Sequence, residues 1–113
     1  MKKLILSLIA LFMFSAFALA QYNDTLWYDN GQIQEIRAYS EFTGQLNGKC
    51  LQYFEDGTLS AVVNYKDGLK DGLWRIWHPN GELAYKLHYK NGERTGTWKG
   101  YDQKGDLLFE KKY

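Results

Sequence analysis

The sequence is built from one repeated phrase, whose last three copies begin 24 residues apart. The segment WHPNGELAYKLHYKNG begins at Trp77, and YFEDGTLSAVVNYKDG begins 24 residues earlier, at Tyr53. A third copy, YDQKGDLLFEKKY, begins at Tyr101, and a more divergent one, WYDNGQIQEIRAY, begins at Trp27. Four copies therefore account for nearly all of the chain after residue 25. Such a period is typical of arrays in which neighbouring repeats bury one another's apolar side chains.

Each copy reads as two β-strands joined by a turn. In the copy that begins at Trp77, the turn signals at 79–81 (PNG) and 90–92 (KNG) flank a run of eight residues rich in Leu and Tyr. Runs of this length and composition favour strands over helices. The order Pro-Asn-Gly predicts a type I turn followed by a left-handed glycine, which is a three-residue hairpin with a G1 bulge. The sequence therefore predicts an all-β fold, a β-hairpin repeat array of about four 24-residue repeats that form an antiparallel meander sheet.

The turn type also sets the expected register, because strand side chains alternate between the two faces of a sheet. His78 should pair with Glu82, and Trp77 with Leu83. Continued outward, this register places Tyr85, Leu87 and Tyr89 on the face of Trp77, and Trp74, Ile76, His78, Ala84, Lys86 and His88 on the other face. Equivalent residues should form one row across eight strands: Trp27, Ile33, Tyr53, Leu59, Trp77, Leu83, Tyr101 and Leu107.

The glycines at 31, 57, 81 and 105 are expected at the hairpin tips, and those at 48, 72 and 96 at the start of each following hairpin. The first copy is two residues longer than the others between Arg37 and Gly48. We interpret this difference as a longer connection, as is common in terminal repeats.

The first twenty residues, MKKLILSLIALFMFSAFALA, combine a basic start, an apolar run and small residues at Ala18 and Ala20. This pattern predicts a signal peptide (residues 1–20) cleaved between Ala20 and Gln21, and hence export to the periplasm or the exterior. A retained membrane anchor is the alternative, since the run is only just long enough to span a bilayer. No Cys follows Ala20, so the lipoprotein signal is missing.

The remaining domain, residues 21–113, has a nearly balanced charge. Without Lys2 and Lys3, 12 basic residues remain against 13 acidic ones, a balance that gives no long-range attraction for nucleic acid or anionic lipid. The single cysteine, Cys50, excludes a disulfide within one chain. It shares one repeat position with Trp74 and Trp98, which favours a small buried hydrophobe over a reactive thiol or an intermolecular bridge.

The period, the turns and the aromatic positions together resemble the MORN repeat, and more closely its bacterial variant. The residues that carry the resemblance are Trp77, Asn80, Gly81, Leu83, Tyr89, Asn91, Gly92 and Gly96, with their equivalents over roughly residues 26–113. The resemblance implies a β-hairpin array used for protein contacts and, in some members, for membrane association. Many bacterial relatives are labelled as the antitoxin of a toxin–antitoxin pair. An exported chain fits that label only as an immunity-type protein acting outside the cytoplasm.

No residue pattern predicts catalysis, a cofactor or a metal site. Ser40 and Ser60 lie in no nucleophile motif. His78 and His88 fall at opposite ends of one expected hairpin, about 20 Å apart at ~3.3 Å per residue, so one metal ion cannot bind both. The carboxylates are scattered through turns, where they cap backbone amides.

Sixteen aromatic residues follow residue 20, and they are the feature that suggests a function. They either fill the thin core of a small sheet or leave part of the row exposed as a contact surface. The preferred hypothesis is a non-enzymatic exported module that binds a protein partner or itself across an aromatic face or a sheet edge. The proposed anchors are Trp27, Tyr53, Trp77 and Tyr101, of which terminal Trp27 should be the most exposed. A carbohydrate-binding envelope protein is the second hypothesis, because Trp and Tyr can stack on sugar rings.

Overall fold

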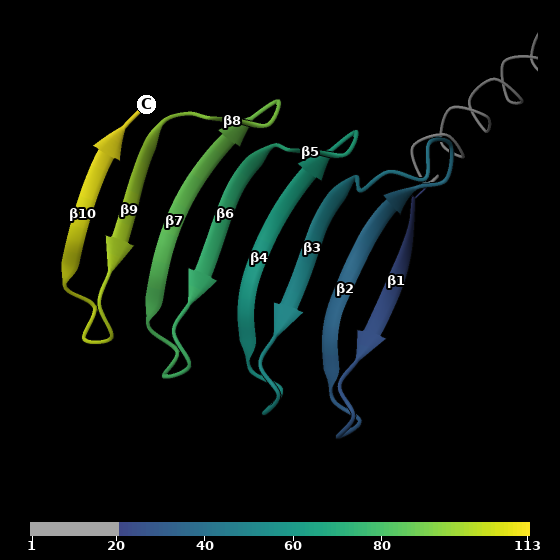
Figure 1. The fold of residues 1–113 in the computed structure, drawn as a ribbon, viewed down its shortest axis with the longest axis horizontal. Coiled ribbons are helices and arrows are strands. Elements are labelled where there is room, and N and C mark those ends of the chain that lie inside the picture. Colours follow the sequence, from purple (N-terminus) through teal and green to yellow (C-terminus); the bar gives the residue numbers. More distant parts are fainter. Residues whose placement is uncertain (1–20) are drawn as a thin grey trace, which may run out of the picture.

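The computed structural model describes residues 21–113, so the predicted leader lies outside the described residues. These residues form one antiparallel sheet of ten strands, with eight long strands in the order of the sequence and two short ones beside them (Figure 1). The strands are β1 (Gln21–Trp27), β2 (Ile33–Ser40), β3 (Gly48–Tyr53), β4 (Leu59–Lys66), β5 (Leu69–Lys70), β6 (Gly72–Trp77), β7 (Leu83–Lys90), β8 (Glu93–Arg94), β9 (Thr97–Tyr101) and β10 (Leu107–Lys112). The predicted all-β meander is confirmed.

The four hairpin tips have the predicted turn. At the β6–β7 tip, the Gly81 amide donates to the His78 carbonyl (3.0 Å), and the His78 amide donates to the Glu82 carbonyl (2.8 Å). Gly81 has a φ of +89°, in the left-handed region that favours glycine. The glycines at 31, 57 and 105 repeat this geometry with φ between +86° and +89°.

A second bulge lies immediately beyond each tip and overturns the predicted assignment of faces. Trp77 pairs with Leu83 as predicted, but the next pair is Ile76 with Tyr85, so Ala84 has no partner. The same irregularity follows the tips of the β1–β2, β3–β4 and β9–β10 hairpins. One extra residue shifts all later residues to the opposite face. Trp74 therefore pairs with Leu87, and Tyr85, Leu87 and Tyr89 share a face with Trp74 and Ile76 rather than with Trp77.

The opposite end of each hairpin is closed by a tight two-residue turn that leads into a short strand. Asp67 and Asn91 have φ of 50° and 51°, and the glycines that follow them have φ of 81° and 83°, as a type I′ turn requires. These turns pair β4 with β5 and β7 with β8. The first copy instead has the predicted longer connection, closed by the Gly44 amide donating to the Ser40 carbonyl (2.9 Å).

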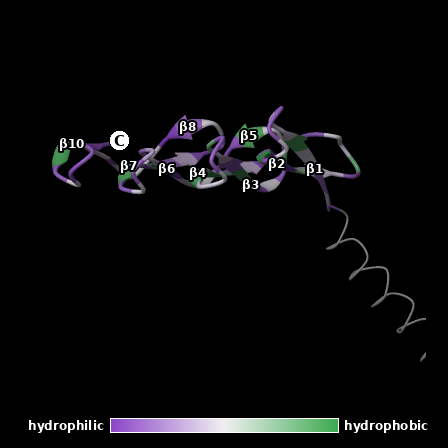
Figure 2. Ribbon diagram, turned by 90° about the horizontal axis from the view of Figure 1, so that it is seen from below, coloured by the Kyte–Doolittle hydropathy of each residue, from purple (hydrophilic) through white to green (hydrophobic). Residues whose placement is uncertain are grey.

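The sheet is a single layer (Figure 2). Its core lies on one face. The central cluster consists of Ala38, Cys50, Ala61 and Val63, against which Leu46, Tyr65, Trp74 and Ile76 pack. We call the side that carries Cys50, Val63, Trp74 and Leu87 the ladder face. Within residues 21–113 no helix could cross a membrane, because the described chain is strands and turns.

Candidate functional site: two sets of aromatic side chains

The ladder face carries a continuous series of aromatic rings, which we call the aromatic ladder. Its members are Tyr65, Trp74, Tyr89, Trp98 and Tyr113, and successive ring centroids lie 5.0 to 5.4 Å apart. The tilted and edge-to-face angles of 58° to 64° are those that aromatic pairs prefer. The ladder therefore ties β4, β6, β7 and β9 together through side chains as well as backbone.

Hydrogen bonds satisfy both indoles of the ladder. Trp74 Nε1–H donates to the Asn64 carbonyl and Trp98 Nε1–H donates to the His88 carbonyl, each at 2.9 Å. The accepting carbonyl belongs in each case to the neighbouring repeat. A buried indole without an acceptor destabilises the fold, so this pairing lets a large side chain serve as core.

The short strands place cations over the ladder rings. Lys70 Nζ lies 4.9 Å from the Trp74 ring centroid and 5.0 Å from that of Tyr89. The Arg94 guanidinium lies 5.1 Å from the Trp98 centroid. The equivalent position in the preceding repeat is Leu46, which packs against the cluster around Cys50. A cation thus accompanies each indole of the ladder, because the indole has a π-face that attracts charge. The cysteine has no such face and is accompanied by an apolar side chain.

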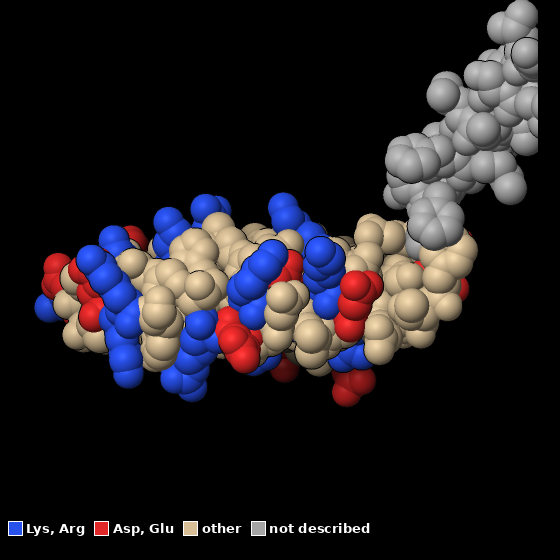
Figure 3. Space-filling view, turned by 90° about the horizontal axis from the view of Figure 1, so that it is seen from above, with Lys and Arg blue, Asp and Glu red and all other residues tan. Residues whose placement is uncertain are grey.

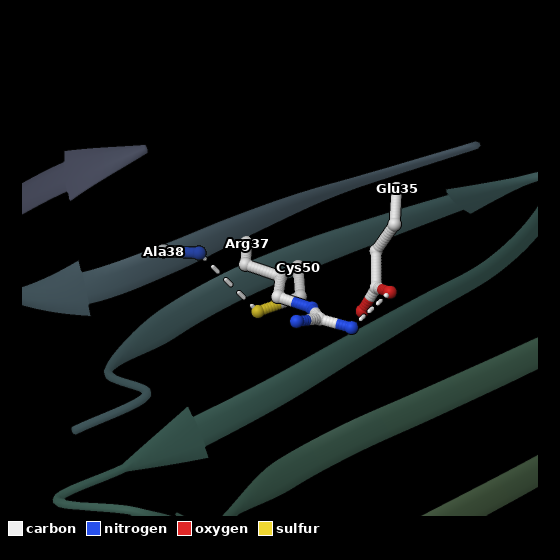
Figure 4. Close-up of polar contacts among 4 residues, drawn as sticks. All are labelled: Glu35, Arg37, Ala38 and Cys50. Carbon is white, nitrogen blue, oxygen red and sulfur yellow. Dashed lines mark hydrogen bonds and ion pairs between the residues drawn. The ribbon is translucent and has the colours of Figure 1, made fainter. Parts of the chain in front are cut away.

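Cys50 lies at the ladder position of its repeat and is 1 % exposed, which confirms its predicted burial. Its Sγ accepts a hydrogen bond from the Ala38 amide at 3.4 Å (Figure 4). Desolvation raises the pKa of the thiol above its ordinary value, so the reactive thiolate is disfavoured.

Beside Cys50 lies the one ion pair among residues 21–113, Arg37 Nη2 to Glu35 Oε2 at 3.0 Å (Figure 4). The side-chain hydrogen bond with Glu35 raises the pKa of Arg37. The pair lies at positions where the later repeats have Val63 and Ala61, so the first repeat replaces part of the apolar core with charge.

The second aromatic set is the predicted row of anchors, which we call the rim row: Trp27, Tyr53, Trp77 and Tyr101. Each pairs with an aliphatic residue across its hairpin, namely Ile33, Leu59, Leu83 and Leu107. Since Trp77 directly follows Ile76, it points to the face opposite the ladder. The predicted row is therefore confirmed as a set of equivalent pairs, but it is separate from the aromatic core.

The rim row has few internal partners. Trp27 is 60 % exposed, and the other three side chains are half-buried, as expected for a terminal Trp27. None of the four rings stacks, donates a hydrogen bond or receives a cation within residues 21–113. Sequence reasoning thus identified these positions but missed the ladder, whose signal is the repeated association of Lys70 with Trp74 and of Arg94 with Trp98.

Three cations lie in register on the same side as the rim row. Arg75 pairs with Lys86 across β6 and β7, and Lys86 pairs with Lys99 across β7 and β9. Arg75 is two residues from Trp77 and Lys99 is two residues from Tyr101, so these side chains share the rim-row face. None of the three forms an ion pair within the described residues, although Glu110 lies directly opposite Lys99 across β9 and β10.

A shallow polar pocket of about 250 Å³ lies between the first two hairpins, near their tips. It is lined by Tyr28, Gln34, Glu35, Gln52, Tyr53 and Ser60. The Tyr28 hydroxyl donates to the Tyr53 carbonyl at 2.6 Å and so bridges the two hairpins beside the pocket. His78 and His88 lie at opposite ends of β7, and no cluster of three metal-binding side chains occurs in the described part of the chain.

Two of the hairpins are similar to a known repeat family. Two consecutive segments, residues 46–67 and 70–91, match the model of the MORN repeat variant. Each matched segment covers one hairpin, β3–β4 in the first case and β6–β7 in the second. No curated protein and no solved structure matched the chain. The β3–β4 and β6–β7 hairpins therefore match the MORN repeat variant as two consecutive repeats within the array.

Proposed function

We propose that the chain is a non-enzymatic interaction module that acts outside the cytoplasm. In this proposal residues 1–20 are a signal peptide and residues 21–113 are the mature repeat domain. The module assignment is supported by the MORN repeat variants, since MORN repeats generally mediate protein or membrane interactions. The export step is tested by the intact mass of the exported form, which should begin at Gln21. A membrane-bound species that retains Met1 would refute this part of the proposal.

The observation that carries the proposal is the exposed Trp27 at the terminal position of the rim row. A single-layer sheet has no second layer to cover its faces, and cations cover parts of the ladder, whereas Trp27 is 60 % exposed. Trp and Tyr are enriched at the energetically important centres of protein interfaces because they supply large contact areas with few rotatable bonds. We assign Trp27, Tyr53, Trp77 and Tyr101 as the anchors.

The cation row defines the chemistry of the partner. Arg75, Lys86 and Lys99 lie opposite one another across β6, β7 and β9 on the rim-row face. Like charges in directly opposite positions are destabilising. An acidic surface docked over them would relieve this repulsion while the rim row contributes apolar contact. The partner is therefore proposed to be a protein with an acidic patch beside an apolar groove. An immunity-type role, as the family resemblance implies, requires the same surface, with an exported toxin as the partner.

Site-specific photo-crosslinking in living cells tests this surface. A benzophenone amino acid in place of Trp27 should give a covalent adduct, whereas the same residue in place of Lys90, at the far end of the sheet, should not. The double change Arg75→Ser and Lys86→Ser should weaken the Trp27 adduct without altering the far-UV circular dichroism. Adducts of equal yield at both positions, or none at position 27, would exclude the rim row as the site.

The pocket between the first two hairpins supports carbohydrate binding as a second candidate. Hydroxyl, amide and carboxylate groups line it, and these groups recognise sugar hydroxyls. Filling the pocket by Ser60→Trp should abolish binding of an envelope oligosaccharide measured by calorimetry. Under the protein-partner proposal, no oligosaccharide binds and Ser60→Trp leaves the Trp27 adduct intact.

A further inference from the structure

The two ends of the sheet each have an open edge. β1 and β10 lie at opposite ends of the strand order, and within residues 21–113 nothing pairs with their outer sides (Figure 1). Exposed large hydrophobic side chains gather at these ends: of ten such residues, six belong to β1, β10 or the residue after it. These six are Tyr22, Trp27, Leu107, Leu108, Phe109 and Tyr113. Open, apolar strand edges are templates for pairing with another chain.

The repeat itself shows what such a pairing looks like. Two residue pairs join each hairpin to the next, at boundaries that we call the inner junctions. The pairs are Glu35 with Gln52 and Ile36 with Leu51 between β2 and β3, Ala61 with Ile76 and Val62 with Arg75 between β4 and β6, and Tyr85 with Gly100 and Lys86 with Lys99 between β7 and β9. β10 holds the position of β2, β4 and β7, and β1 holds that of β3, β6 and β9. Because β1 and β10 also run antiparallel (Figure 1), a second copy placed at the end of the sheet continues the same pattern.

We propose that a second copy of this chain docks head to tail, with the outer edge of its β1 on the outer edge of β10. Equivalence with the inner junctions sets Phe109 opposite Leu26 of the second copy, and Glu110 opposite Thr25. This inference rests on the proposed function as an interaction module and names one of its partners.

The side chains on the ladder face are complementary in this register. Phe109 lies over Gly100, where its ring fills the space of the missing side chain, with its centroid 6.3 Å from that of Tyr85, and it is 40 % exposed. Leu26 of the second copy would pack against it. One step further Lys111, whose Nζ lies 5.0 Å from the Tyr113 ring centroid, would face Asp24. Apolar and charged positions are thus both matched.

The charges on the two edge strands favour pairing of β10 with β1 over pairing of either strand with its own copy. Lys111 occupies the repeat position of Arg37, Val63 and Leu87, and Asp24 that of Cys50, Trp74 and Trp98, so apart from Arg37 these positions are uncharged in the inner junctions. Inward-pointing charges on edge strands normally prevent association. Here the two edges carry opposite signs, so β10 with β10 or β1 with β1 brings like charges together, whereas β10 with β1 forms an ion pair. Such a heterologous contact does not close on itself and yields chains of copies.

Charge exchange tests the pairing on the protein as purified after expression of the full chain. In sedimentation velocity the average mass of the parent should rise with concentration. Lys111→Glu alone and Asp24→Lys alone should each lower the association constant at least tenfold, and an equimolar mixture of the two should recover it. The mixture recovers because every junction then has one Lys and one acidic residue. The control variants Lys90→Glu and Glu93→Lys, in an exposed turn, should associate as the parent does.

A disulfide trap tests the register and does not depend on the charge variants folding. In the double variant Thr25→Cys and Glu110→Cys, the introduced thiols lie at opposite ends of one sheet, so only two copies can bring them together. Directly opposite strand residues have the spacing that a disulfide needs. Oxidation should give a series of covalent oligomers of increasing size. Either single variant should stay monomeric, because buried Cys50 does not react. Covalent dimers from Thr25→Cys alone would show β1-to-β1 pairing and refute the inference.

The outcomes separate this inference from the proposed function. A parent that stays monomeric at all concentrations, yet gives a Trp27 adduct in cells, removes the head-to-tail contact and leaves the module intact. Self-association that is lost in Trp27→Ala but kept in Lys111→Glu would assign the contact to the rim row instead and overturn the edge pairing.

Discussion

Trp98 is 9 % exposed and Trp27 is 60 % exposed, although both lie in strands of one thin sheet. The ring of Trp98 contacts Tyr89 and Tyr113, its indole donates to the His88 carbonyl, and Arg94 lies over it. The side chain of Trp27 makes none of these interactions within the described residues. The aromatic excess of this chain therefore lies in two settings: the ladder contains the buried Trp98, and the rim row contains the exposed Trp27 together with three half-buried rings.

The comparison shows how a sheet without a second layer remains stable. Large side chains cover one another along the ladder face, and aliphatic stems ending in cations cover the rings from outside. Figure 3 shows Lys and Arg side chains spaced along the end of the sheet where β5 and β8 lie. No comparable cover exists for Trp27 in residues 21–113, whereas the other three rim-row side chains are half-buried.

The largest expected effect is that of Trp98→Ala. Removing a buried indole costs roughly 3–5 kcal/mol and leaves the His88 carbonyl without its donor. Trp77→Ala, matched in chemistry but half-buried and without a hydrogen bond, should cost clearly less. Urea denaturation followed by circular dichroism measures both. Equal midpoints for the two variants would contradict the division into core and surface.

Gly81→Val should have the next largest effect, about 1–3 kcal/mol. A side chain at Gly81 would meet no atom within 4 Å, so the cost is that of holding a β-branched residue at φ +89°. Because this tip fixes the pair of Trp77 with Leu83, the variant should disturb the rim row before the ladder. Lys86→Val is the control, since a β-branched residue suits a strand and the change relieves charge repulsion. A melting temperature as high as the control's would refute the turn.

The smallest expected effect is that of Lys70→Met, about 0.5–1 kcal/mol. The substitution keeps an unbranched apolar stem over Trp74 and Tyr89 but removes the charge 4.9 Å from the indole. Lys66→Met, at an exposed site without a ring beneath it, should leave the unfolding midpoint unchanged. If both variants unfold at the same denaturant concentration, the cation contributes nothing and the ladder is held by ring contacts alone.

Much of this architecture could be predicted from the sequence because glycine has few substitutes at a left-handed position. The tips at Gly31, Gly57, Gly81 and Gly105, and the pair of Trp77 with Leu83, follow from that requirement. The second bulge could not be predicted. Its extra residues are Gln34, Ser60, Ala84 and Leu108, which share no chemical property and need no special residue type. One extra residue, which no sequence signal marks, therefore placed Tyr85, Leu87 and Tyr89 on the face of Trp74 rather than on that of Trp77.

The candidate site was predicted in part for the same reason. The rim row lies between the tip and the bulge, so its pairs were set by the turn alone and were predicted correctly. The ladder lies beyond the bulge, where a period-two extrapolation fails. The cations over the ladder come from short strands at the opposite end of the hairpins, and only the three-dimensional turn at Asp67 or Asn91 brings them back over the rings.

Side-chain hydrogen bonds join some neighbouring hairpin tips and not others. Asn30 and Asn80 each donate a side-chain hydrogen bond to the next tip, at 2.9 and 2.7 Å, and Tyr28 and His78 bond the adjacent carbonyls. The second repeat has Phe54 and Asp56 at these positions, and Asp56 instead bonds Thr58 of its own turn. Under a bending load the tips of the second and third repeats should separate first.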